Sequence, residues 1–302
     1  MKGVVTSAKL VGIDKAINTR FNQGRTRVPN FVGRLCTRIV STNAKEAYGW
    51  INNIPGLDKD SAEVIKQSLE MTGHEITNSE FDKAITIPRT AVEDDAYGMF
   101  ANVAEEFGSK GAQRPDTELI SKLLASFTTL KAWTGKALFA TDHALSKSVT
   151  HNNKGTKKLS AANFQTGYAV IRNAKDGAGD PLFTMADPSK VFLVVDPDYE
   201  ATADSIVRMD TLSTGGRNPN YNKAQVIVIP GLGHSWFILD NSATVGGLIF
   251  QDRLPLSITA NFNLTSEDVL KYKQFAWYAR SRFAIGAGRP EYAYGSTGAD
   301  AA

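Results

Sequence analysis

The four histidines of this chain, which are its natural acid–base groups, lie far apart in the sequence. Asp142 and His143 form the pair best suited to hydrolysis, because an imidazole next to a carboxylate can act as a general base. A Thr-Asp-His run in a turn more commonly binds backbone groups. We therefore interpret the pair as structural, and a hydrolase using Asp142 and His143 remains an alternative function.

Each motif that would indicate a metal or phosphate site lacks a residue that the site needs. His74-Glu75 begins a metalloprotease pattern, but Asn78 stands where the second histidine is required. Gly135-Lys136 resembles the end of a phosphate-binding loop, but Ala137 lacks the hydroxyl that binds magnesium. Cys36 is the only cysteine, which excludes a disulfide within the chain. We expect no cofactor, no bound metal and no enzymatic activity.

The composition predicts a folded protein without a membrane segment. The 302 residues are 42% hydrophobic, and no apolar run reaches the roughly 18 residues of a membrane span. The opening residues are interrupted by charges too often for a signal peptide, so we expect the protein to stay in the cytoplasm.

The formal net charge of +3 hides a basic N-terminal arm at residues 1–38. The arm has one acid, Asp14, and eight basic residues: Lys2, Lys9, Lys15, Arg20, Arg25, Arg27, Arg34 and Arg38. Such a segment can dock on a neighbouring copy, on another acidic protein surface or on nucleic acid. The alternative is a solvated, loosely ordered terminus.

Residues Phe81–Gly98 predict a strand, a stop and a helix start. In an extended segment Phe81, Lys83, Ile85 and Ile87 fall on one side, and Pro88 then removes the next backbone donor. Thr90 and Glu93 have the spacing of a capping box, so we expect a helix that begins at Thr90. Its apolar spacing continues to Phe127, and we expect one long helix with a break near Pro115, with two separate helices as the alternative.

The segment 160–240 has an α/β pattern. Ser160 can cap a helix, and Val191–Val195 is a continuous apolar run typical of a strand buried on both faces. Asp196 and Pro197 supply an N-cap and a first-turn proline for a further helix. A small mixed sheet flanked by helices is the prediction.

The C-terminal part returns to strands. From Phe275 to Ile285, aromatic and small residues alternate with a second set that includes arginines, which predicts a strand; an amphipathic helix over 268–283 is the alternative. If this strand pairs with the one that ends near Pro88, the domain is discontinuous in sequence.

Several segments, in this order, resemble the major head subunit of Mu-like tailed phages. They span most of residues 40–298 and read YGWINNIPGL, FDKAITIPRTAVEDDAYG, LFATDHAL, DGAGDPLFTMADPSKVFLVVDP, HSWFILDNS, LIFQDRLPL and GAGRPEYAYGSTG. The resemblance implies an α+β fold, the HK97-type major capsid fold. Its expected parts are an N-terminal arm at 1–38, an extended loop at 39–89, a peripheral domain with a long spine helix at 90–159 and 241–302, and an inserted axial domain at 160–240.

The resemblance also implies a function. The protein would be a major capsid protein whose pentamers and hexamers form the icosahedral head shell of a virion, assembled in the host cytoplasm. Its expected partners are copies of itself, a scaffold, a portal, a cement protein in some members, and packaged DNA bound without sequence specificity. The alternative is an encapsulin-like nanocompartment shell of the same fold.

The contact candidates between subunits come from the loop and the arm. The loop contains more large apolar residues than a segment facing only water needs, so they either bind a neighbour or cover their own spine helix. The candidates are Tyr48, Trp50, Ile51, Ile54 and Leu57 in the loop, and Arg25, Arg27 and Arg34 in the arm.

Overall fold

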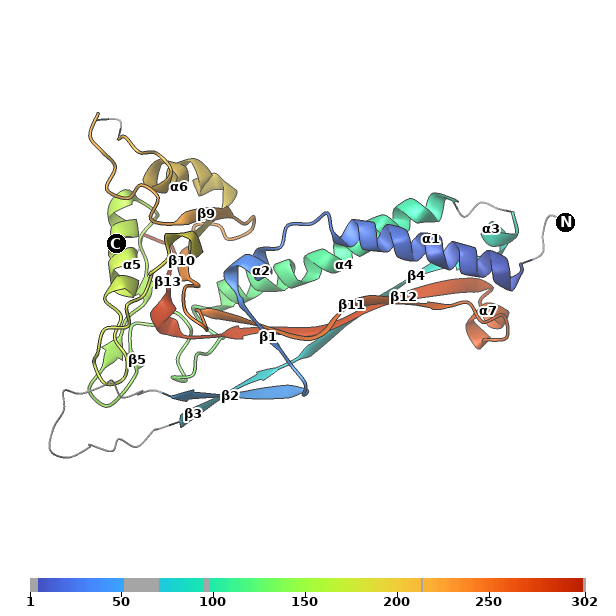
Figure 1. The fold of residues 1–302 in the computed structure, drawn as a ribbon, viewed down its shortest axis with the longest axis horizontal. Helices are drawn as coiled ribbons and strands as arrows, with labels where there is room; N and C mark the ends of the chain where they lie inside the picture. The colour runs from blue at the N-terminus through green and yellow to red at the C-terminus, as the bar shows by residue number, and fades with distance from the viewer. Residues whose placement is uncertain (1–4, 52–70, 95–97, 213, 301–302) are drawn as a thin grey trace.

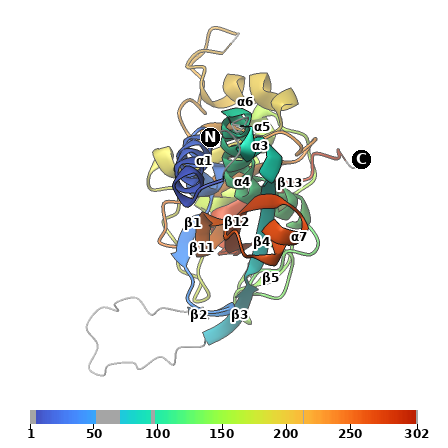
Figure 2. The same cartoon turned by 90° about the vertical axis from the view of Figure 1, so that its right-hand side faces the viewer.

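The computed structural model describes residues 5–51, 71–94, 98–212 and 214–300. An elongated part, built from two long helices on a twisted sheet, joins a compact part at one end (Figure 1). A two-stranded hairpin leaves the elongated part on the side opposite the helices (Figure 2). In the described part of the chain, no helix is long and apolar enough to cross a membrane.

The sheet of the elongated part has the strand order β1-β11-β12-β4. These strands are β1 Thr37–Val40, β11 Leu248–Asn261, β12 Gln274–Ala287 and β4 Ser79–Pro88. β12 and β4 are antiparallel, and Trp277 lies opposite Ile85. This confirms both predicted strands and shows that the sheet joins segments far apart in sequence, and the alternative of an amphipathic helix over 268–283 is wrong. Only the short helix α7, Glu267–Lys271, precedes β12.

The spine helix α4, Gly98–Ala125, crosses the sheet and contains Pro115 without interruption. The expected break is therefore wrong. Leu119 and Leu123 beyond the proline are fully buried, and this packing outweighs the one backbone hydrogen bond that proline removes.

The N-terminal arm is an integral part of the subunit. Helix α1, Ser7–Arg25, lies along α4 and buries Leu10, Ile13, Ile17 and Phe21. The short helix α2, Phe31–Leu35, follows, and the carboxylate of Asp116 accepts the amide of Val32 at its first turn. A loosely ordered terminus is wrong for the described residues of the arm, because α1 has an apolar face at helical spacing.

The capping box at Thr90 and Glu93 is also wrong. Helix α3, Arg89–Glu93, begins one residue earlier, with Pro88 at the cap position and no side-chain cap hydrogen bond. The carboxylate of Glu93 instead accepts from Arg89 Nε at 2.9 Å. This ion pair at i, i+4 uses the side chain that the capping box required.

The compact part contains a five-stranded sheet with the order β7-β13-β10-β8-β9. The strands are β7 Lys154–Gly155, β13 Ala293–Ser296, β10 Trp236–Asp240, β8 Val191–Val195 and β9 Gln225–Val228. Helices α5, Ala161–Arg172, and α6, Glu200–Val207, pack on it, and Ser160 caps α5 as predicted. Asp196 caps the 3-10 turn Pro197–Tyr199 that leads into α6, and α6 itself has no side-chain cap hydrogen bond. β13 comes from the C-terminal segment, which the sequence placed in the other domain.

Three smaller features complete the chain. The hairpin consists of β2 Lys45–Ile51 and β3 Met71–Thr77. β5 His143–Ala144 pairs with β6 Thr150–His151. Short 3-10 turns lie at Pro188–Lys190, Pro197–Tyr199 and Pro290–Tyr292.

Candidate assembly surfaces

The hairpin β2–β3 is fixed at its base by one carboxylate. Glu46 accepts from Ser41 Oγ at 3.0 Å, from the amide of Thr42 at 2.7 Å and from the amide of Asn43 at 2.9 Å. These donors, the Asn43 amide first, lower the pKa of Glu46, so the group stays ionised. Asn78 Nδ2 donates to Ser41 Oγ at 2.8 Å and joins β3 to the same turn. Glu46 on β2 and Asn78, which follows β3, therefore both bind the turn at 41–43.

Tyr48 lies on its own subunit. Its hydroxyl donates to Gln251 Oε1 at 2.9 Å, and Gln251 is fully buried. Burial raises the pKa of Tyr48. The contacts of Tyr48 therefore fit the alternative in which the loop residues cover their own subunit. Tyr48 covers the sheet, however, and not the spine helix. Ile54 and Leu57 lie outside the described residues, as do the side chains of Trp50 and Ile51.

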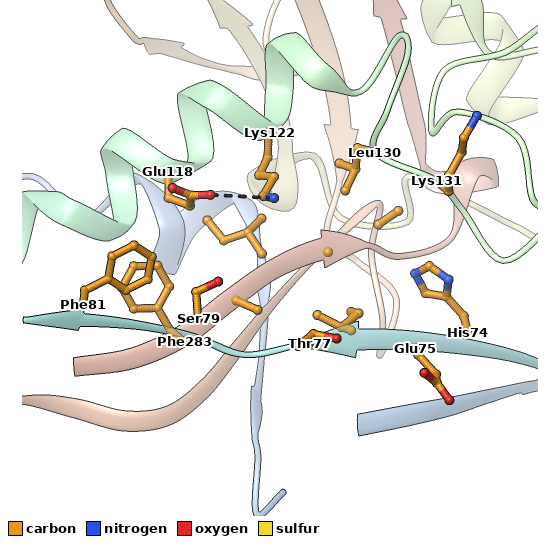
Figure 3. A pocket seen from close by; sticks show the side chains of 15 residues that line it. His74, Glu75, Thr77, Ser79, Phe81, Glu118, Lys122, Leu130, Lys131 and Phe283 are labelled. Atoms are coloured by element: carbon orange, nitrogen blue, oxygen red, sulfur yellow. Dashed lines mark ion pairs between the residues drawn. The ribbon is translucent and has the colours of Figure 1, made fainter. Parts of the chain in front are cut away.

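A cleft lies between the hairpin, the spine helix and the sheet (Figure 3). It has a volume of about 240 Å³, and its walls carry His74 and Glu75 from β3 and Glu118 and Lys122 from α4. Glu118 pairs with Lys122 at 3.7 Å and with Arg114 at 3.1 Å. Burial lowers the pKa of His74. The described residues include no group of three His, Cys, Asp or Glu side chains that could hold a metal ion.

The three candidate arginines contact their own subunit at partly exposed positions. Arg27 pairs with Glu105 on α4, and its side chain is 70% exposed. Arg25 donates to the carbonyl of Leu256 at 2.9 Å. Arg34 donates to Gln225 Oε1 at 3.2 Å. Because a guanidinium has five N–H donors, each arginine can still bind a second partner.

Asp142 and His143 do not form an acid–base pair. The carboxylate of Asp142 binds Lys136, and this ion pair lowers the pKa of Asp142. His143 is fully buried, with Nδ1 2.7 Å from Thr134 Oγ1 and Nε2 3.1 Å from the carbonyl of Leu138. Both ring nitrogens are therefore occupied by structural contacts, which is the interpretation that the sequence favoured.

The sequence missed several exposed apolar side chains. The exposed fraction is 85% for Phe183, 75% for Met99, 62% for Leu270 and 58% for Tyr272. Met99 belongs to the apolar spacing that predicted the helix, yet the structure exposes it. The other three stand alone or beside one other apolar residue in a polar segment and leave no periodic signal. Exposure of this kind was therefore visible only in the structure.

Comparison with known protein families identifies one match. The model of the family described as the Mu-like prophage major head subunit gpT matches residues 10–158, 152–232 and 229–300, which is nearly the whole chain.

Two curated relatives have similar sequences. The major head subunit of the Mu-like prophage FluMu of Haemophilus influenzae is 28% identical over 150 residues, which are 50% of this chain and 47% of that protein. The major capsid protein of Escherichia phage Mu is 24% identical over 285 residues, 94% of this chain and 72% of that protein. The chain thus spans about half the length of the first relative and about three quarters of the second.

Among solved structures, the procapsid of bacteriophage JBD30 has a similar fold. The TM-score is 0.58 at 22% identity, over 97% of this chain and 76% of that one. At this level of identity, the likeness is evidence for the fold alone.

Proposed function

This chain belongs to the Mu-like prophage major head subunit family and has the HK97-type capsid fold, and we propose that its copies form pentamers and hexamers of an icosahedral shell around phage DNA. Membership of this family makes it a major capsid protein. The proposal concerns how the subunits meet and what they enclose.

The observation that carries the proposal is the projecting hairpin. A two-stranded hairpin is only marginally stable in water, and its two outer edges leave backbone groups unpaired. β2–β3 is nevertheless held firmly at its base through Glu46 and Asn78. A hairpin of this shape gains stability when it lies on another surface, and in a shell a neighbouring copy supplies that surface.

We keep the four-part division of the chain as part of the proposal, with changes at its boundaries. The four-stranded sheet with α1 and α4 corresponds to the peripheral domain, and the five-stranded sheet corresponds to the axial domain. β7 and β13 join the axial domain, so 154–155 and 293–296 leave the peripheral segments 90–159 and 241–302. The peripheral domain in turn takes α1, β1 and β4 from the arm and loop segments. Trp50, Ile51, Ile54 and Leu57 remain proposed contacts with a neighbour.

The basic residues of the arm support a contact with DNA. Lys15, Arg20 and Arg25 on α1 and Arg27 just beyond it are exposed, while Asp14, the acid of this helix, accepts from Trp277 Nε1. A basic helix surface binds phosphate groups without reading sequence. A scaffold and a portal protein, with a cement protein in some heads, complete the proposed partners, and assembly takes place in the host cytoplasm.

Sedimentation velocity tests the proposal. The purified protein, alone or with its scaffold, is expected to pass from free subunits to fast particles over a narrow concentration range, because many weak contacts act together in a shell. A species that stays monomeric at every concentration tested refutes the proposal. The contents of particles isolated from cells distinguish a phage head, which encloses DNA, from a nanocompartment, which encloses an enzyme.

A further inference from the structure

Phe183 is the most exposed large apolar side chain in the described part of the chain, with an exposed fraction of 85%. It lies in the loop between α5 and β8. A single exposed apolar residue is common in proteins, but the backbone here is unusual. Phe183 has a φ of +45°, and Met185, two residues later, has a φ of +55°. Bulky residues rarely adopt this left-handed conformation, which costs conformational free energy.

Buried contacts fix this loop from the sheet side. The side chain of Met185 is 3% exposed and packs in the core of the axial domain. Its amide donates to Asp240 Oδ2 at 2.6 Å, and Asp240 at the end of β10 is fully buried. Breaking this contact would leave a buried carboxylate oxygen without its donor, which is costly.

Helix α5 fixes the loop from the other side. The hydroxyl of Thr184 donates to the carbonyl of Ile171 at 2.6 Å. Arg172 Nη1 donates to the carbonyl of Met185 at 3.1 Å and also to that of Thr184. Phe183 therefore cannot turn inward without breaking several buried hydrogen bonds, and the fold presents its ring to the outside in one conformation.

We infer that Phe183 is an anchor residue that inserts into a second copy of this chain. An aromatic ring on a fixed backbone loses little entropy on binding, which is why such residues dominate the energetics of many interfaces. The loop, residues 173–190, contains three aspartates, Asp176, Asp180 and Asp187, and two lysines, Lys175 and Lys190, and the aspartates nearest to Phe183 disfavour the phosphate backbone of DNA as the partner. The inference rests on the proposed function, since a shell surrounds each copy with identical neighbours.

Two substitutions separate assembly from folding. Phe183→Asn and Phe183→Gly place residues that tolerate the left-handed conformation at this position. Both variants are expected to melt at or above the wild-type temperature, while the concentration needed for shell assembly rises at least tenfold. Phe183→Tyr keeps the ring and is expected to assemble like the wild type.

A photo-crosslinker identifies the partner. With p-benzoylphenylalanine in place of Phe183, irradiated shells are expected to give a product of two capsid chains, with the crosslinked peptide in the second copy. A Phe183→Asn variant that assembles at the wild-type concentration overturns the inference, and so does a crosslink only to a scaffold or cement protein. After either of these two outcomes, the proposed function still stands if the wild-type protein forms shells. If the wild-type protein never forms shells, the proposed function and the inference about Phe183 are both wrong.

Discussion

Trp277 Nε1 donates a hydrogen bond to Asp14 Oδ1 at 2.9 Å, and this bond joins residues 263 positions apart in the chain. Trp277 is fully buried in β12, and Asp14 lies on α1. The bond ties the first helix to the central strand of the sheet. The N-terminal segment is thus a structural element of the folded subunit.

Asp14→Ala is predicted to destabilise the subunit by about 1–3 kcal/mol, because it leaves the buried indole N–H without an acceptor. Denaturant unfolding of the unassembled subunit measures the change. Lys15→Ala, at the next and exposed position of α1, is the control and is expected to change stability by less than about 0.5 kcal/mol. Equal effects of the two substitutions would contradict this role of Asp14.

The helices α1 and α4 approach each other at two glycines. A Cβ added at Gly24 would lie 1.8 Å from the backbone oxygen of Glu105, and one added at Gly108 would lie 2.1 Å from that of Phe21. Gly24→Ala and Gly108→Ala are each predicted to cost at least about 2 kcal/mol, since the helices must separate.

Gly12 provides the matched control for these two glycines. It lies on the exposed side of α1, and no atom lies within 4 Å of an added Cβ. Gly12→Ala is predicted to stabilise the subunit by about 0.5–1 kcal/mol through helix propensity. Thermal melts of the three variants test the packing, and a tolerated Gly24→Ala would show that α1 does not lie this close to α4.

Much of the fold could be predicted from local sequence patterns. The alternation before Pro88, the Ser160 cap and the apolar run Val191–Val195 all gave correct elements, because each depends on neighbours in sequence. The interruption at Pro115 and the cap at Thr90 failed because tertiary packing and the Arg89–Glu93 ion pair decide those positions.

The role of the arm was harder to predict. Its charge suggested a docking segment or a loosely ordered terminus, yet Leu10, Ile13, Ile17 and Phe21 already had helical spacing. The close approach at Gly24 and the joining of β13 to β10 depend on residues far apart in sequence. The exposed ring of Phe183 depends on backbone angles that no sequence pattern indicated.

Glu46→Ala is predicted to loosen the hairpin without unfolding the body. The amides of Thr42 and Asn43 and the hydroxyl of Ser41 would lose their shared acceptor. Hydrogen exchange is expected to speed up in β2 and β3, at 45–51 and 71–77, while β11 and β12 keep their protection.

The control for this prediction is Lys45→Ala, which removes only an exposed ion pair of 3.9 Å with Glu75. Its exchange pattern is expected to match the wild type. Unchanged exchange in Glu46→Ala would show that the carboxylate does not fix the hairpin, and the proposed contact of the hairpin with a neighbouring copy would lose its support.

Acid is predicted to destabilise the subunit through His151. Burial lowers the pKa of His151 to about 4 from its usual 6.5. The pKa of His151 is lower in the folded subunit than in the unfolded chain. The contribution of His151 to the free energy of unfolding is therefore fully present above pH 6.5 and is lost as the pH falls towards 4. The loss at pH 5 is about 2 kcal/mol, and burial of His143 adds to it in the same direction.

Unfolding free energies at pH 7.5 and pH 5.0 test this prediction. His151→Asn is expected to have a smaller difference between the two pH values than the wild type. His234→Asn, which changes an exposed ring, is expected to keep the wild-type difference. An unchanged pH dependence in His151→Asn would mean that other groups cause the acid sensitivity.

The central claim is that copies of this chain bind one another to form a closed shell. Cryo-electron microscopy of the assembled protein tests it most directly. The expected result is an icosahedral particle in which pentamers and hexamers of this fold place the β2–β3 hairpin of each copy on its neighbour. Particles without this repeated contact, or a protein that remains a single subunit under all assembly conditions, would contradict the claim.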